Sequence, residues 1–67
     1  MRIIFNGKDK EIPDHISTVD DLVREMVKND RGKLIEVNGR LIRKGERAVS
    51  VIREGDRIEL IQFMGGG

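Results

Sequence analysis

The first apolar residues of the chain form a short continuous run that is typical of a strand. Residues 2–6 are rich in β-branched and aromatic side chains, and the last of them, Asn6, forms an Asn-Gly pair with Gly7. An Asn-Gly pair after such a run predicts a hairpin, because a type I′ turn needs positive φ at both central residues. The return strand is expected over residues 8–12 and ends at Pro13, since proline cannot donate to a ladder. The chain is therefore expected to open with a β-hairpin.

The next apolar residues follow the period of a helix. They recur at i, i+3, i+4, i+7 and i+8, which forms one apolar stripe: Val19, Leu22, Val23, Met26 and Val27. Thr18 is the expected N-cap, and Asp21 is placed to complete a capping box. Residues 29–32 (Asn-Asp-Arg-Gly) are expected to end the helix, because Gly32 is free to adopt the left-handed conformation. The pattern predicts an amphipathic helix over about residues 18–29.

Strand-like patterns return after this helix. Residues 34–37 form an apolar run that a second Asn-Gly pair closes, and residues 40–43 form a short return strand. Residues 44–53 show no period, and their apolar side chains are expected to fold under the sheet: Ala48, Val49, Val51 and Ile52. A Glu-Gly-Asp turn at residues 54–56 precedes the last strand, which is expected over residues 57–63.

This order of elements predicts an α+β fold of the ubiquitin-like β-grasp type. One amphipathic helix covers one face of a mixed four- to five-stranded sheet, and the first and last strands are parallel neighbours at its centre. Residues 1–64 are expected to form the domain, and residues 65–67 a flexible Gly-Gly-Gly tail. The sheet side chains expected to face the helix are Ile3, Phe5, Ile35, Val37, Ile58 and Leu60.

Alternation along the strands also leaves apolar residues on the face that no helix covers. Those expected there, or at the end of the last strand, are Ile4, Leu34, Ile61 and Phe63. Scattered exposed apolar residues need no function. A cluster beside a C-terminal tail, however, is a candidate docking surface for a partner protein.

Composition narrows the function classes. The 67 residues suffice for one domain, and the absence of cysteine excludes disulfides, thiolate metal sites and a cysteine nucleophile. The 13 basic and 12 acidic residues nearly balance, whereas a dedicated nucleic-acid binder usually shows a basic excess. No signal peptide or membrane-spanning run is evident, so a cytoplasmic protein is expected. The basic stretch 40–47 is either a solvated surface or a contact for an acidic partner.

An enzyme is the least expected class. His15 is the only histidine, and neither a nucleophile nor a metal-ligand cluster accompanies it in the sequence. A solvent-exposed loop histidine is the simplest interpretation.

The most informative feature is the end of the chain, Phe63-Met64-Gly65-Gly66-Gly67. Together with the run Glu54-Gly55-Asp56-Arg57-Ile58-Glu59-Leu60 and the Val37-Asn38-Gly39 turn, it resembles the thiamine-biosynthesis sulfur-carrier (ThiS) family. The resemblance extends over the whole chain. Three glycines stand where the family's essential feature is a terminal pair, so Gly65 is expected to act as a spacer.

The resemblance implies a sulfur carrier, expected to be a monomer when free and not an enzyme. A ubiquitin-activating-like adenylyltransferase would consume ATP to adenylate the carboxylate of Gly67. A sulfur donor such as a cysteine desulfurase would then supply the sulfur of a thiocarboxylate, which thiazole synthase would take into the thiazole ring. Gly65 and Gly66 would thread into partner sites. The expected docking residues are Phe63, Met64, Ile61, Leu34 and Ile4. No bound cofactor or metal is expected.

Two alternatives share parts of this pattern. A MoaD-like carrier for molybdopterin synthesis, or a carrier for tRNA thiolation, would use the same fold and chemistry. MoaD-like chains are usually longer and often have prolines before the final glycines, which residues 62–64 lack. An RNA-binding β-grasp module of the TGS type would need neither a glycine end nor this charge balance.

Overall fold

The computed structural model describes residues 1–62, in which five strands and two helices follow one another. The elements are β1 (Arg2–Phe5), β2 (Lys8–Glu11), α1 (Val19–Met26), β3 (Lys33–Val37), β4 (Arg40–Ile42), the 3₁₀ helix η1 (Lys44–Val49) and β5 (Arg57–Gln62). The expected last strand is thus present, although Phe63 lies outside the described residues. No helix within residues 1–62 is long and apolar enough to cross a membrane.

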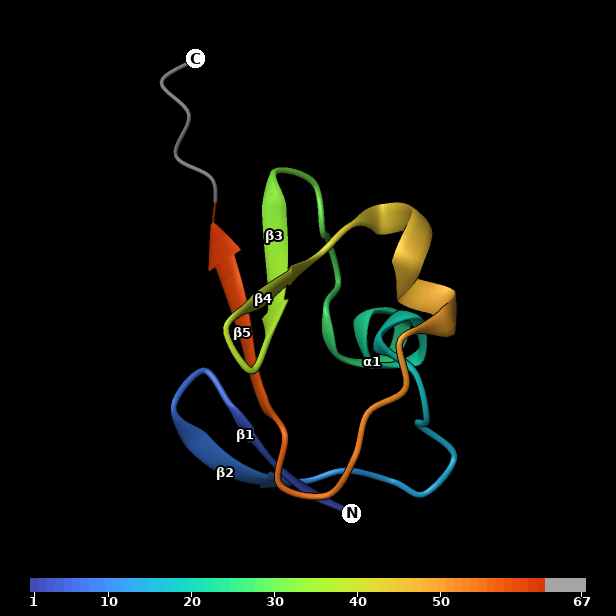
Figure 1. Ribbon diagram of the computed structural model, residues 1–67, viewed down its shortest axis with the longest axis vertical. Coiled ribbons are helices and arrows are strands. Elements are labelled where there is room, and N and C mark those ends of the chain that lie inside the picture. The colour runs from blue at the N-terminus through green and yellow to red at the C-terminus, as the bar shows by residue number, and fades with distance from the viewer. Residues whose placement is uncertain (63–67) are drawn as a thin grey trace.

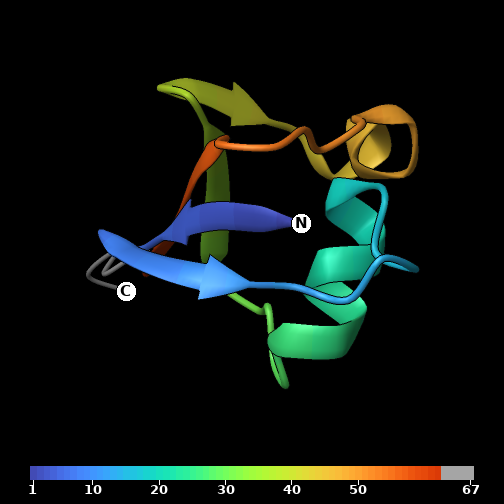
Figure 2. The same cartoon turned by 90° about the horizontal axis from the view of Figure 1, so that it is seen from below.

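The strands form one mixed sheet in the order β2-β1-β5-β3-β4. β1 and β5 are parallel, and the other neighbouring pairs are antiparallel. The helix α1 lies on one side of this sheet, and η1 lies next to α1 (Figures 1 and 2). The expected two-layer arrangement, with the first and last strands as parallel neighbours at the centre, is confirmed.

Both Asn-Gly pairs form the turns that the sequence predicts. Asn6 and Gly7 have φ of 50° and 82°, and Asn38 and Gly39 have φ of 52° and 83°. Positive φ at both central residues is the mark of a type I′ turn, whose twist matches that of the flanking strands. These turns set the registers of the β1–β2 and β3–β4 hairpins.

The helix begins as predicted but ends earlier. The Thr18 hydroxyl accepts a hydrogen bond from the backbone N–H of Asp21, and the Asp21 carboxylate accepts one from the N–H of Thr18, both at 3.1 Å. At the other end the helix stops at Met26, not near residue 29, because Val27 is extended with φ of −117° and ψ of 106°. Val27 is nevertheless buried, so leaving the helix keeps this side chain in the core. Asn and Asp at the next positions are also poor helix formers.

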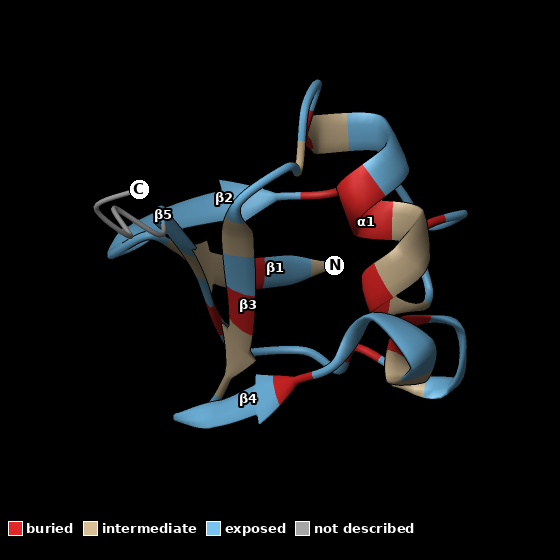
Figure 3. Cartoon of the chain, turned by 90° about the horizontal axis from the view of Figure 1, so that it is seen from above, coloured by how far each residue is buried: buried red, intermediate tan, exposed pale blue. Residues whose placement is uncertain are grey.

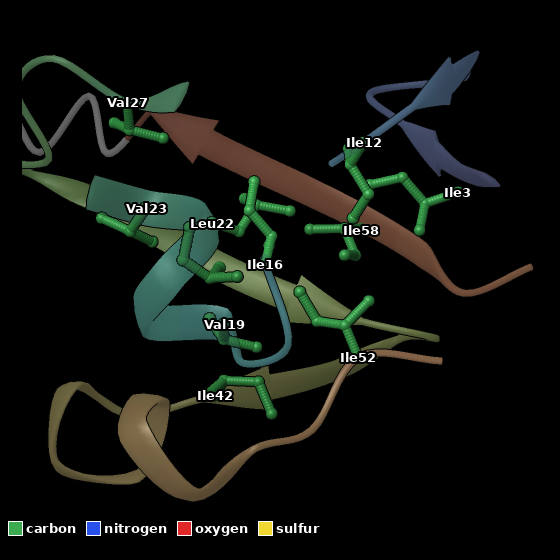
Figure 4. Close-up of a cluster of buried hydrophobic side chains, with 11 residues drawn as sticks. Ile3, Ile12, Ile16, Val19, Leu22, Val23, Val27, Ile42, Ile52 and Ile58 are labelled. Carbon is green, nitrogen blue, oxygen red and sulfur yellow. The ribbon is translucent and has the colours of Figure 1, made fainter. Parts of the chain in front are cut away.

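The core lies between α1 and the sheet (Figures 3 and 4). Its buried side chains are Ile3, Ile12, Ile16, Val19, Leu22, Val23, Val27, Ile35, Ile42, Ile52 and Ile58. The expected inward positions Ile3, Ile35 and Ile58 are at most 1% exposed. Complete burial of such a side chain stabilises the fold by about 1.5–3 kcal/mol. The other three expected positions are half-buried and pack against the core: Phe5, Val37 and Leu60.

The connection between β4 and β5 differs from the expectation. Of its apolar side chains only Ile52 is buried, Ala48 is exposed, and Val49 and Val51 are 77% and 56% exposed. The reason is the short η1 helix and the backbone pairing that follows it, in which Ser17 accepts a hydrogen bond from the N–H of Ile52 at 2.9 Å. This pairing turns Ile52 inward and its neighbour Val51 outward.

Candidate functional site

The candidate site is built around the end of β5, the central strand from which the chain continues to its C-terminus. β5 lies between β1 and β3, and its last described residue, Gln62, pairs with Lys33. The glycines Gly65, Gly66 and Gly67 and the expected docking residues Phe63 and Met64 lie outside the described residues. The structure therefore describes the surface beside the start of the tail.

The beginning of β5 is held by the turn residues that carry the family resemblance. The Asn38 side chain accepts a hydrogen bond from the N–H of Arg57 at 2.9 Å and donates one to the Asp56 carboxylate at 3.0 Å. The second Asp56 oxygen accepts from the N–H of Arg53 at 2.8 Å. The Asn-Gly turn and the Gly-Asp turn thus form one network. In the sequence the two turns are separate patterns, and nothing in either predicts that they contact each other.

The middle of β5 is held from the opposite side. The Asn6 side chain accepts a hydrogen bond from the N–H of Leu60 at 2.8 Å, and the Asn6 N–H donates to the Ile58 carbonyl at 2.9 Å. The two asparagines that form the hairpin turns therefore also fix β5 along its length. These hydrogen bonds position β5 within the sheet.

The face of the sheet opposite α1 presents an apolar pair at this end of β5. Leu34 and Ile61 are register partners and are 41% and 38% exposed. Leu41, which is 46% exposed, lies one strand further out and diagonal to Leu34. Ile4 is half-buried and pairs with Arg57, four residues before Ile61, which is about 13 Å along a strand. The structure brings Leu34 and Ile61 together and places Ile4 apart from them.

Next to this apolar pair, two carboxylates face each other. Glu36 on β3 and Glu59 on β5 are register partners on the uncovered face. Like charges directly opposite each other are unfavourable in a sheet. Neither forms an ion pair with a basic side chain of residues 1–62. This uncovered face thus combines apolar side chains with a local negative charge.

The basic stretch 40–47 does not form one solvated surface. Arg40 is exposed and lies 3.9 Å from Glu46, whereas Arg47 is only 6% exposed. Arg47 Nη1 donates to Asp30 Oδ2 at 2.6 Å, and this hydrogen bond holds the pKa of the Asp30 carboxyl below its usual value. The Arg47 side chain lines a groove that also includes Lys33, Leu34 and Lys44. Nothing in the sequence pattern distinguishes Arg47 from its exposed neighbours.

The histidine that the sequence offers, His15, lies on the surface. His15 is exposed and forms a hydrogen bond through Nε2 to Glu25 Oε1 on α1. No group of three or more histidine or acidic side chains in this part of the chain could hold a metal ion. An exposed loop histidine with one carboxylate partner is what surface ion pairing produces.

Comparison with solved structures relates this arrangement to known proteins. The crystal structure of a thiamine biosynthesis protein (ThiS) from Geobacter metallireducens matches with a TM-score of 0.88 at 28% identity, over 100% of both chains. The NMR solution structure of a thiamine biosynthesis protein from the same organism matches with a TM-score of 0.70 at 25% identity, over 100% of this chain and 88% of that one. The expected ubiquitin-like β-grasp fold is therefore confirmed.

Sequence comparison points in the same direction. Thiazole synthase of Paramagnetospirillum magneticum (strain ATCC 700264 / AMB-1) is 28% identical over 67 residues, which is 100% of this chain and 20% of that protein. The chain thus spans a fifth of the length of the curated relative that it matches. The ThiS family model matches residues 3–67, which include the glycine end. Because that match covers nearly the whole sequence, the chain belongs to the ThiS family.

Proposed function

We propose that this protein carries sulfur for thiamine thiazole synthesis on the carboxyl group of Gly67. The observation that carries the proposal is the ThiS family match over residues 3–67, because it spans the domain and the glycines together. In this role the chain is a co-substrate that other enzymes modify. The domain, residues 1–64, presents the tail, and residues 65–67 enter the partner sites.

The proposed chemistry activates a poor electrophile. A Gly67 carboxylate oxygen attacks the α-phosphate of ATP on an adenylyltransferase, pyrophosphate leaves, and an acyl adenylate forms. A persulfide sulfur from a donor such as a cysteine desulfurase then attacks the carbonyl carbon and displaces AMP. A second thiol cleaves the resulting S–S bond, which leaves the thiocarboxylate on Gly67 and a disulfide on the donor side. Glycines without side chains leave the carbonyl accessible to each attacking group.

Thiazole synthase is the proposed sulfur acceptor. A protein of that name contains a region similar to this whole chain, over a fifth of its length. Carrier and acceptor sequences in one polypeptide would be expected if the two act together. This observation favours the thiamine pathway over molybdopterin synthesis or tRNA thiolation.

The proposed docking surface is the uncovered face beside the end of β5. Leu34 and Ile61 would form its apolar centre, because they are opposite each other and partly exposed. Phe63 and Met64 would extend it toward the tail, and Ile4 would contribute only to its far margin. Apolar side chains with a charged surround are typical of the centre and rim of a protein interface.

Intact-mass spectrometry tests the proposed function directly. The protein is incubated with a purified adenylyltransferase of this family, ATP and a cysteine desulfurase with cysteine. The expected result is a mass gain corresponding to replacement of one oxygen by sulfur, absent when Gly67 is deleted or when one alanine is added after it. Lys10→Ala on the outer strand β2 serves as the control and is expected to react like the wild type.

The acceptor assay follows with the thiocarboxylated protein. Incubation with thiazole synthase and its other substrates is expected to return the original mass as sulfur leaves. Thiocarboxylate formation that does not depend on Gly67 would contradict the assignment of the modification to this residue. Sulfur transfer to a molybdopterin synthase large subunit or a tRNA thiolation enzyme, but not to thiazole synthase, would overturn the pathway.

A further inference from the structure

A groove lies at the end of β4, where that strand stops covering β3. β4 pairs with β3 only from Ile35 to Val37, and the chain then leaves the sheet at Arg43. Within residues 1–62, Lys33 and Leu34 therefore have a neighbouring strand on the β5 side alone. The space left is a groove of about 410 Å³, here called the β4-end groove. Its lining residues are Asp30, Gly32, Lys33, Leu34, Leu41, Ile42, Arg43, Lys44 and Arg47.

The β4-end groove is strongly positive. Lys33, Arg43 and Lys44 form no ion pair with any carboxylate of residues 1–62. Arg47 is 6% exposed, and its buried Nε has no hydrogen-bond partner in the same part of the chain. Asp30 is the only acidic residue among those that line the groove, and its carboxylate already accepts a hydrogen bond from Arg47. A buried, incompletely paired guanidinium below exposed cations favours an anionic occupant.

The groove also has an apolar wall. Leu34 and Leu41 line it and are 41% and 46% exposed. A second hollow, of about 580 Å³, has no such charge excess, because its lining includes two arginines, Arg40 and Arg53, and two acidic residues, Glu46 and Asp56. An isolated phosphate would use the cations and leave the leucines exposed. A peptide with acidic and apolar side chains would satisfy both.

We propose that the β4-end groove binds a short, extended acidic segment of a protein that handles the tail. Its carboxylates would contact Lys33, Arg43 and Lys44, and an apolar side chain would pack on the two leucines. The position of the groove supports this occupant. Lys33, which lines the groove, is the register partner of Gln62, the last described residue before the tail. A protein that holds the tail therefore lies within reach of the groove. The identity of this partner rests on the proposed function, whereas the acidic nature of the segment does not.

Charge reversal with a matched control tests the partner. The double variant R43E/K44E changes two exposed groove cations, and K8E/K10E makes the same change of charge on β2, at the opposite edge of the sheet. Affinity for the purified adenylyltransferase and for thiazole synthase is measured by calorimetry at low and high salt. R43E/K44E is expected to weaken binding to at least one of them by about tenfold or more, with a weaker salt dependence. Equal effects of the two double variants on both enzymes would overturn the proposal.

A peptide titration tests the groove without either enzyme. An extended peptide of alternating glutamate and leucine is added to the ¹⁵N-labelled protein, and a lysine–leucine peptide of equal length is the control. Only the acidic peptide is expected to shift the amide signals of Lys33, Leu34 and Lys44, and R43E/K44E is expected to abolish these shifts. If the charge reversal perturbs the fold, R43Q/K44Q replaces it. Amide shifts centred on β2, or no shifts at all, would contradict the proposal that the β4-end groove binds an acidic segment.

The two experiments also separate the two proposals. A wild-type protein that gains no sulfur contradicts the proposed function, and the peptide titration still decides whether the groove binds an acidic segment. A wild-type protein that gains sulfur, while the acidic peptide and the charge reversal have no effect, contradicts the groove alone.

Discussion

Ile35 and Leu34 are neighbours on β3, yet the sheet places them in opposite situations. Ile35 is 0% exposed in the core between α1 and the sheet, and Leu34 is 41% exposed on the face that no helix covers within residues 1–62. The two side chains have the same number of atoms and nearly the same hydrophobicity. What differs is the layer on each side of the sheet. Apolar character alone therefore does not distinguish core from candidate interface, whereas alternation relative to α1 does.

The largest expected effect follows from this pair. Ile35→Ala is expected to lower the free energy of unfolding by about 2–5 kcal/mol, because the site is closed on every side and cannot collapse fully. Leu34→Ala removes a similar number of carbons from a partly hydrated site, so a loss of about 0.5 kcal/mol or less is expected. Urea unfolding followed by circular dichroism measures both. Equal losses would show that the two faces are not energetically distinct.

The second prediction addresses the use of the uncovered face. The double variant L34T/I61T places β-branched threonine, which suits a strand, at both positions but removes the apolar pair. Affinity for the adenylyltransferase is expected to fall about tenfold, or 1.4 kcal/mol, while the free energy of unfolding changes little. Val49→Thr is the matched control, because Val49 is 77% exposed but lies in η1, away from this face. Unchanged binding by L34T/I61T would remove Leu34 and Ile61 from the docking surface.

The smallest effect concerns the start of the helix that covers the core. Hydrogen bonds from the backbone N–H groups of Ser17 and Thr18 hold the pKa of Asp21 below its ordinary value of 3.8. Because the folded-state pKa is the lower one, Asp21 contributes stability above the unfolded value. That contribution is lost as the pH falls below about 4 and through the folded value. Acid should therefore weaken the N-terminal cap of α1, the helix that covers the core.

Asp21→Asn isolates this contribution. The variant is expected to be less stable than the wild type at pH 7 and to lose less stability between about pH 5 and pH 2. Part of the acid sensitivity should remain, because the pKa values of Glu11 and Asp30 are also lowered. Thermal unfolding at a series of pH values measures the difference. Parallel pH profiles for the two proteins would contradict the role of the capping carboxylate.

Much of the fold could be predicted because its signals are local. Asn6-Gly7 and Asn38-Gly39 specify their own turns, and Thr18 with Asp21 specifies its own cap. Alternation along β3 and β5 is enough to predict that Leu34 and Ile61 lie on the uncovered face. Each of these inferences needs only a few adjacent residues and the backbone geometry that they favour.

The features that could not be predicted depend on contacts between distant segments. Arg47 is buried because Asp30, 17 positions earlier, meets it across the fold. The helix ends at Met26, and Val27 is buried in an extended conformation, although the periodicity would also place it on the buried side of a longer helix. The link between Asn38 and Asp56 likewise joins two turns that only the finished sheet brings together. No local pattern contains this information.

The place of β5 between two strands also has a mechanical consequence. A pull applied at Gln62, the last described residue of β5, would act along a strand that is parallel to β1 and antiparallel to β3. Such a load acts in shear, so the ladder bonds on both sides, with those from Asn6 and Asn38, must yield together rather than one after another. The same pull on an edge strand such as β2 would be opposed by one ladder only. The proposed capture of the tail would therefore load a strand that a ladder holds on each side.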